Sequence, residues 1–192
     1  MPRTTIDTTL CVAVLLHACS ASARAATSPV SFDSFDIAGS IGYSIAGIND
    51  EGTIAGTWTA DGVTFDGFIR SPRGLITAPV IEPNDNEGFT VVRAINDEGV
   101  VAGFYGAAIG HGFLLIAGSY TRWDFPGAAS TALRGMNNLG DLAGTYFTDP
   151  NADPIGFIVP RRGVPISFRY PTPTASGIVV GGINDLRAVA GY

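Results

Sequence analysis

A phrase of ten residues occurs four times in this chain, and its repetition limits the possible folds more than any other feature. The copies are GINDEGTIAG at 47–56, AINDEGVVAG at 94–103, GMNNLGDLAG at 135–144 and GINDLRAVAG at 182–191. Their first asparagine recurs after 47, 41 and 47 residues, and the dipeptide Gly-Phe follows three of the copies in the same order. Markers that keep one order at one period predict a fold built from repeated units.

Each unit is predicted to consist of short β-strands. Apolar segments such as YSIAGI and VVAGFY flank the phrase, a third segment begins at Gly-Phe, and YTRWDF is typical of a fourth. Glycine and proline, 25 and 12 residues, interrupt the chain too often for a sustained helical period. The pattern predicts an all-β, antiparallel, propeller-like array of about three and a half four-stranded units. A β-sandwich is the alternative, although it leaves the period unexplained.

The phrase itself is typical of a hairpin turn between the first two strands of a unit. A type I turn closed by a glycine bulge needs a glycine with positive φ, and an asparagine at its start can bond the backbone two residues on. The residues predicted to build these turns are Asn49, Gly52, Asn96, Gly99, Asn137, Gly140 and Asn184. Arg187 replaces the glycine in the fourth copy, so we expect that hairpin to be strained or differently bent.

The N-terminal 25 residues are predicted to be a signal peptide. Arg3 precedes a short apolar run from Leu10 to Ala18, and Ala23-Arg24-Ala25 matches the small-x-small pattern before a cleavage site. The run is too short to span a bilayer. We therefore expect a secreted or periplasmic protein without a transmembrane segment. Lipid attachment at Cys19 is the alternative.

Composition excludes several functions for the mature chain. Cleavage after residue 25 removes Cys11 and Cys19, the only two cysteines, so no disulfide or thiol site remains. The chain has no lysine, and the mature part would carry 9 arginines against 16 acidic residues. Such an acidic chain without a basic cluster argues against nucleic acid as a partner. One histidine, His111, remains after cleavage, which excludes a multi-histidine metal site within one chain.

The repeats resemble those of the HAF family of extracellular repeat proteins of bacteria. In that family a similar Gly-Ile-Asn-Asp-x-Gly-x-Ile-x-Gly stretch precedes Gly-Phe and then Asp-x-Pro-Gly-Ala, as do GINDEGTIAG, GFLLIAGSYTRWDFPGAAST and GMNNLGDLAG here. The resemblance spans residues 32–192, but Asp-x-Pro-Gly-Ala is complete only at Asp124–Ala128. It implies an exported, propeller-like repeat protein and no catalytic residues.

The repeat domain is predicted to cover residues 30–192, with units that start near residues 35, 82, 123 and 168. The fourth copy of the phrase is followed by Tyr192 and by no Gly-Phe segment. We therefore expect the array to be an incomplete part of a longer propeller. Exposed strand edges at its two ends would favour self-association.

Acidic residues at equivalent places in the units are the candidate ligand residues. Asp50, Asp97 and Asp185, with Asn138 in the third copy, are expected on one rim, where they could bind a cation or sugar hydroxyls. Asp36 and Asp124 share a second position with Glu82, whereas Arg169 occupies it in the fourth unit. The favoured interpretation of both sets is that they are turn residues in contact with solvent.

Other motifs point only weakly to chemistry. PNDNEG at 83–88 has alternating oxygen ligands that suggest calcium, but it lacks the distant bidentate glutamate of an EF-hand. His111 in GHGF is expected to be a loop or packing residue, and no nucleophile elbow or phosphate loop occurs. We therefore predict a non-enzymatic module that binds an extracellular protein or carbohydrate, without a cofactor. The alternatives are a carboxylate-dependent hydrolase or lyase acting on polysaccharide, and a truncated, non-functional fragment.

Overall fold

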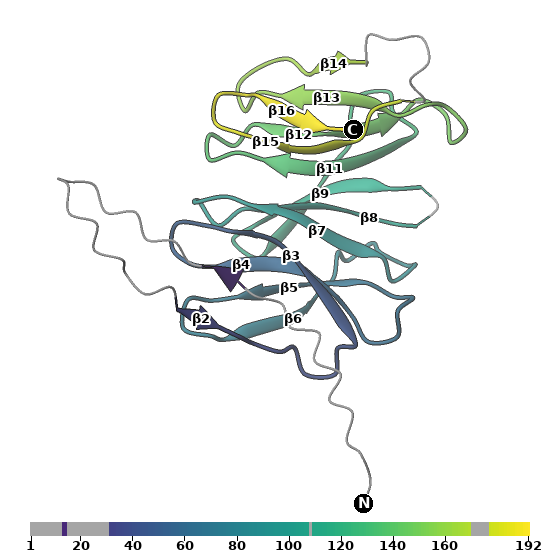
Figure 1. The fold of residues 1–192 in the computed structure, drawn as a ribbon. Helices are drawn as coiled ribbons and strands as arrows, with labels where there is room; N and C mark the ends of the chain where they lie inside the picture. The colour runs from purple at the N-terminus through teal and green to yellow at the C-terminus, as the bar shows by residue number, and fades with distance from the viewer. Residues whose placement is uncertain (1–12, 15–30, 108, 170–176) are drawn as a thin grey trace, which may run out of the picture.

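The computed structural model describes residues 13–14, 31–107, 109–169 and 177–192. Every regular element in these ranges is a β-strand, and none is a helix. Figure 1 shows three large antiparallel sheets side by side, with the last hairpin beside the third sheet. The predicted all-β, propeller-like array is therefore confirmed as three four-stranded units and one further hairpin. No sheet closes on itself within the ranges described.

The strands of each unit pair in chain order. Unit 1 contains β3 (Gly42–Ile48), β4 (Ile54–Thr59), β5 (Asp66–Arg70) and β6 (Ile76–Val80). Unit 2 contains β7 (Thr90–Ile95), β8 (Val101–Tyr105), β9 (His111–Ile116) and β10 (Ser119–Trp123). Unit 3 contains β11 (Ser130–Met136), β12 (Leu142–Phe147), β13 (Ile155–Val159) and β14 (Ile166–Phe168). Unit 4 contains β15 (Val180–Ile183) and β16 (Val189–Gly191).

A short antiparallel pair precedes the units. It joins β1 (Ala13–Val14) to β2 (Phe32–Asp33). β1 falls within the segment that the sequence predicts to be a signal peptide, and the rest of that segment lies outside the described residues. Within the described ranges, no helix is long and apolar enough to cross a membrane.

The Gly-Phe and Ala-Gly markers of each unit pack against each other. The marker phenylalanines Phe68, Phe113 and Phe157 are fully buried, and each lies directly opposite the glycine of Ala-Gly on the neighbouring strand. A Cβ on Gly103 would lie 2.9 Å from the Phe113 ring and would also meet the carbonyl oxygen of Val91. The second strand is thus crowded by its neighbours in its own sheet.

The first strands of the units lie side by side across the array. β7 contacts both β3 and β11, and β11 contacts β15. Each of these strands has a bulge at which the pairing register skips one residue: Ala46, Arg93, Arg134 and Gly181. A bulge changes the direction of a side chain relative to the regular strand. These four residues line one cavity of about 320 Å³.

The hydrophobic core lies between neighbouring sheets. One cluster joins Val92 and Phe113 of unit 2 to Ala55 of unit 1, and another joins Ala102 of unit 2 to Leu133 of unit 3. Burial of these apolar side chains supplies the main driving force for packing the sheets against each other, because each sheet alone would leave a hydrophobic face in water. The position of each sheet, and with it the cavity at the bulges, is therefore set by its neighbour.

Candidate functional site

The four Asn-Asp phrases form hairpin turns of one geometry. In the first, Gly52 donates to the carbonyl of Asn49 at 2.9 Å, and Thr53 donates its N–H to the Asn49 side chain at 2.8 Å. The corresponding glycines Gly52, Gly99 and Gly140 have φ of 82°, 74° and 77°. The Asn49 side chain therefore caps the backbone four residues on. In the fourth turn Asn184 Oδ1 accepts from the N–H of Ala188 at 2.9 Å and also from that of Leu186 at 3.1 Å, two residues on, as the sequence suggests.

The turns also bind one another from unit to unit. The backbone N–H of Asp50 donates to Asp97 Oδ1 at 2.8 Å, that of Asp97 to Asn138 Oδ1 at 3.1 Å, and that of Asn138 to Asp185 Oδ1 at 2.9 Å. The Asn49 side chain donates to the Asn96 carbonyl at 3.3 Å, and Asn137 does the same to Asn184 at 3.0 Å. The predicted rim carboxylates thus lie along one edge, where they join neighbouring units.

The second acidic position does not form a common site. Asp36 is exposed, and Glu82 is 2% exposed and accepts hydrogen bonds from Asn84 at 2.6 and 3.1 Å. Asp124 instead contacts His111, whose Nδ1 lies 3.2 Å from its Oδ2, and Arg122, whose Nε donates to the same oxygen at 2.6 Å. The structure therefore brings His111 to one of the predicted carboxylates.

The loop suggested as a calcium site is held by its own backbone. The two oxygens of Asp85 accept hydrogen bonds from the N–H groups of Glu87 at 3.1 Å and Phe89 at 2.6 Å, and from the hydroxyl of Thr90 at 2.7 Å. Among the residues that the structure describes, no three His, Cys, Asp or Glu side chains come together as metal ligands.

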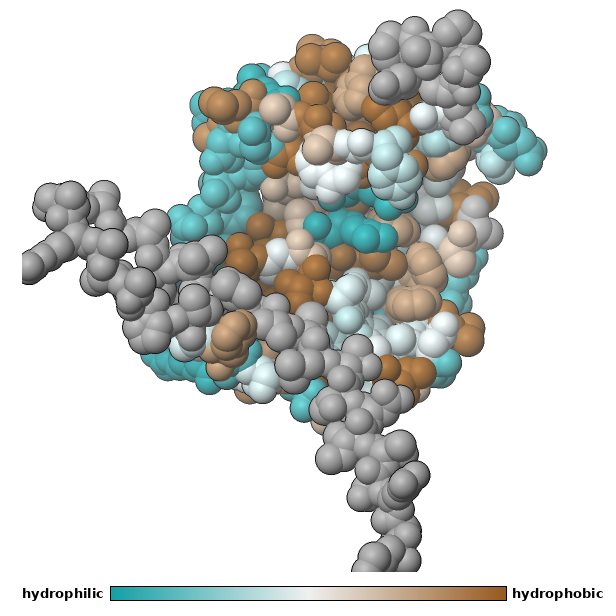
Figure 2. Space-filling view, viewed as in Figure 1, coloured by the Kyte–Doolittle hydropathy of each residue, from teal (hydrophilic) through white to brown (hydrophobic). Residues whose placement is uncertain are grey.

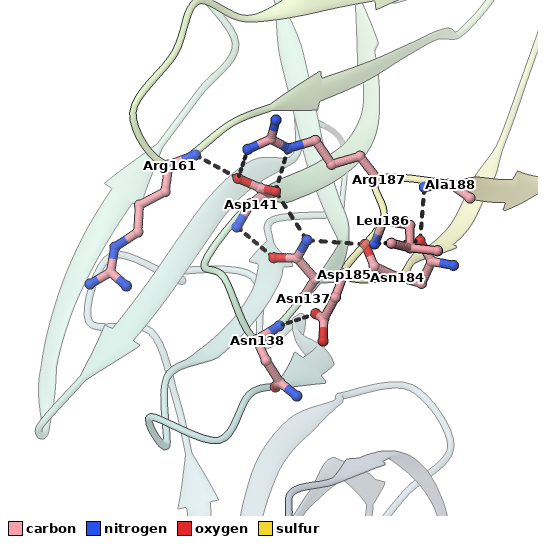
Figure 3. A network of polar contacts seen from close by, with 9 residues as sticks. All are labelled: Asn137, Asn138, Asp141, Arg161, Asn184, Asp185, Leu186, Arg187 and Ala188. Atoms are coloured by element: carbon pink, nitrogen blue, oxygen red, sulfur yellow. Dashed lines mark hydrogen bonds and ion pairs between the residues drawn. The ribbon is translucent and has the colours of Figure 1, made fainter.

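An ion pair between units 3 and 4, with a buried carboxylate and a half-exposed arginine, is absent from the sequence-based predictions. Arg187 Nε donates to Asp141 Oδ2 at 2.7 Å, and the Asp141 side chain is 1% exposed (Figure 3). The same carboxylate accepts from the backbone N–H of Arg161 at 2.9 Å and from the Asn137 side chain at 3.1 Å. The hydrogen bond from Arg187, followed by the other two, lowers the pKa of Asp141 to about 2.

This ion pair explains the departure of the fourth turn from the phrase. Arg187 has a φ of 61°, so it adopts the left-handed conformation of the glycine it replaces. The turn is therefore not differently bent, and its non-glycine residue carries the strain that the sequence predicts. The sequence does contain a signal for this ion pair, because two neighbouring copies of the phrase each gain a charged residue. Arg187 replaces the glycine of the fourth copy, and Asp141 in the third copy stands where the first two copies have the uncharged Thr53 and Val100.

Two arginines meet in the cavity lined by the bulges of the first strands. Arg93 and Arg134 each stand three residues before a turn asparagine, where units 1 and 4 have Ala46 and Gly181. Their guanidinium carbons lie 5.6 and 5.5 Å from the centre of the Phe104 ring. Figure 2 shows a small hydrophilic patch near the middle of the view, with hydrophobic surface at its sides, where β7 and β11 lie in Figure 1.

Neither guanidinium has a carboxylate partner among the described residues. Arg93 and Arg134 form no ion pair there, and the buried Nε of Arg134 has no hydrogen-bond partner. Burial, and then the like charge of Arg93, lower the pKa of Arg134, with a smaller opposite effect from Tyr192. A guanidinium nevertheless stays charged in proteins, so two positive charges share this cavity.

The units also differ at the position of Phe104, which lies at the same place, and unit 4 has the aromatic Tyr192 there. The corresponding residues of units 1 and 3 are Thr57 and Thr145, whose hydroxyls accept hydrogen bonds from the backbone N–H of Val92 and Val180 at 3.0 and 3.2 Å. Unit 2 has an aromatic ring instead, in contact with both arginines. Sequence reasoning missed this group, although an alignment of the four units shows that they differ at both positions.

A search with this chain finds no matching family model, no matching curated protein and no matching solved structure. The resemblance to the HAF repeats therefore stays a prediction.

Proposed function

We propose that this chain is an exported, non-enzymatic repeat module that binds an anionic ligand between its first strands. The observation that carries the proposal is the pair formed by Arg93 and Arg134, two cations without a carboxylate partner in the described part of the chain. Residues from positions at which the units differ, these two arginines and Phe104, meet at one place. In a repeat protein the regular residues build the scaffold, so a cluster of residues at variable positions indicates the binding site.

The chemistry of the pair favours an oxyanion. A guanidinium presents a planar fork of N–H donors that matches the two oxygens of a carboxylate, and it binds phosphate and sulfate in the same manner. An anion between the two arginines would reduce the repulsion between the two charges. The site is therefore preorganised for negative charge.

The overall charge limits the size of the anion. The whole chain carries a net charge of −6, which repels a long polyanion such as nucleic acid. A single anionic group on an extracellular carbohydrate or protein avoids most of this repulsion. Export is supported by the apolar run and the Ala-Arg-Ala site of the first 25 residues, and N-terminal sequencing of the secreted protein tests it.

Titration with sulfate and with propionate, followed by NMR, tests the binding site. We expect saturable shifts at residues on β7 and β11 in the native chain, and their loss in the double variant Arg93→Gln and Arg134→Gln. Arg73→Gln is the control, since this arginine is exposed in a turn of unit 1 and its replacement also removes one positive charge. Equal binding by the control and the double variant would refute the proposal.

One observation favours the rival function, a hydrolase or lyase that uses a carboxylate. The contact between His111 and Asp124 leaves the second ring nitrogen of the histidine available as a general base, and Arg122 holds the carboxylate. On this hypothesis His111→Gln abolishes turnover of an acidic polysaccharide while the double arginine variant retains it. If the native chain does not turn over the acidic polysaccharide, the hydrolase or lyase hypothesis is refuted.

A further inference from the structure

A second cavity adjoins the arginine pair and differs from it in chemistry. It has a volume of about 260 Å³ and is lined by the aromatic rings of Phe89, Phe104 and Phe147, by small residues that include Ala132, and by Arg134. Arg134 thus lines both cavities. The two spaces form one site with a charged part and an aromatic part.

The aromatic part is open to a ligand because it is only partly filled by the protein. Phe89 and Phe104 lie 6.2 Å apart, and both rings are partly exposed, as is Phe147. A cavity of about 150 Å³ lined by apolar side chains is large enough for benzene, so the space here can take one ring or a short acyl chain. The Ser130 hydroxyl adds little polar character to this cavity, since it already forms hydrogen bonds with the backbone of Gly110.

The charged part fixes which end of a ligand enters which cavity. Among the described residues that line the aromatic cavity, Arg134 is the only charged one, and its guanidinium carbon lies 5.5 Å from the centre of the Phe104 ring. An oxyanion on Arg93 and Arg134 would therefore lie within a few bond lengths of the aromatic rings. A ligand that carries both groups gains both interactions at once.

We propose that this site binds an amphipathic carboxylate, with the carboxylate on Arg93 and Arg134 and an aromatic or acyl group among Phe89, Phe104 and Phe147. The proposal rests on the anion site described above and adds the chemical class of its ligand. Burial of one ring contributes binding that a simple anion lacks, so the two kinds of ligand differ in affinity at the same site.

Three related probes test the proposal on the whole chain: 3-phenylpropionate, propionate and 3-phenylpropanol. NMR titration should give a dissociation constant for 3-phenylpropionate at least about tenfold lower than that for propionate. The alcohol, which has the ring without the charge, should also bind at least about tenfold more weakly. Saturation-transfer NMR on the native chain should show the closest contact at the phenyl protons.

Two variants separate the parts of the site. Arg134→Gln should reduce the affinity for 3-phenylpropionate to that for the alcohol. Ala132→Leu places a larger side chain in the aromatic cavity and should reduce the affinity for 3-phenylpropionate to that for propionate, while propionate binds as before. Circular dichroism checks that both variants fold, and the saturation-transfer result on the native chain stands without them.

The outcomes distinguish this inference from the proposed function. Equal affinity for propionate and 3-phenylpropionate, both lost in Arg134→Gln, would overturn the amphipathic ligand and leave the anion site standing. Failure of all three probes to bind, with sulfate also failing, would overturn both. Strong binding of the alcohol would show an apolar site in which the arginines have no part, and would likewise overturn the proposal.

Discussion

Replacement of Gly103 by alanine tests the packing on which every unit depends. An added methyl group would lie 2.9 Å from the Phe113 ring and would also meet the carbonyl oxygen of Val91, closer than the 3.0 Å that real Cβ atoms respect. Overpacking of a core costs about 1–3 kcal/mol, and here both a ring and a backbone carbonyl must move. The smaller entropy of the unfolded alanine chain offsets about 0.4–1 kcal/mol. We expect Gly103→Ala to lower the free energy of unfolding by about 2 kcal/mol.

Urea denaturation followed by far-UV circular dichroism and tryptophan fluorescence measures this change. Gly182→Ala is the matched control, since an added methyl there meets no atom within 4 Å, and we expect it to raise the free energy of unfolding by about 0.4–1 kcal/mol through the unfolded chain alone. Adding Phe113→Leu to Gly103→Ala should recover only part of the loss, because the Val91 carbonyl remains in the way. A Gly103→Ala chain as stable as the native one would refute the packing of Gly-Phe on Ala-Gly.

Three further outcomes follow from the contacts between units. The pKa of Asp141 in the folded chain, about 2, lies below its ordinary value of 3.8, so its contribution to stability is complete above pH 3.8 and is lost as the pH falls through about 2. Urea midpoints between pH 2 and 7 should show this loss, and the loss should be smaller in Asp141→Asn, which keeps the contribution of Asp61, whose pKa is also lowered to about 2 by hydrogen bonds from Val63 and Thr64. Arg187→Gly should raise the pKa of Asp141, as carboxyl NMR would detect, because the largest cause of its lowering is removed. Asn96→Ala removes the acceptor of the Val100 N–H at 2.9 Å and should cost about 1–2 kcal/mol by urea denaturation, whereas the exposed Asn138→Ala should cost less.

The architecture could be predicted because its signals are local. The phrase with Asn49 and Gly52 specifies its turn through one side-chain cap and one residue with positive φ, and both act within five residues. The period of about 45 residues then indicates a stack of equal units. Strand pairing within each unit follows, because consecutive strands joined by short turns pair with their neighbours.

The structural role of the acidic residues could be predicted only in part. That Asp97 and Asp185 stand on one rim follows from the equivalence of the units. Their bonds to the backbone N–H groups of Asp50 and Asn138 do not, because those bonds depend on how closely neighbouring sheets pack. The distance between sheets is set by buried side chains such as Phe113, which no local pattern specifies.

The sequence by itself determined the strands, the turns and the positions at which each unit departs from the repeat. Only the tertiary structure decided which departures meet. Arg93 and Arg134 are 41 residues apart in the chain, and the bulges of β7 and β11 direct them to the same ring, that of Phe104. Such a meeting depends on the bulge and on the packing of one sheet against the next, which are properties of the whole array.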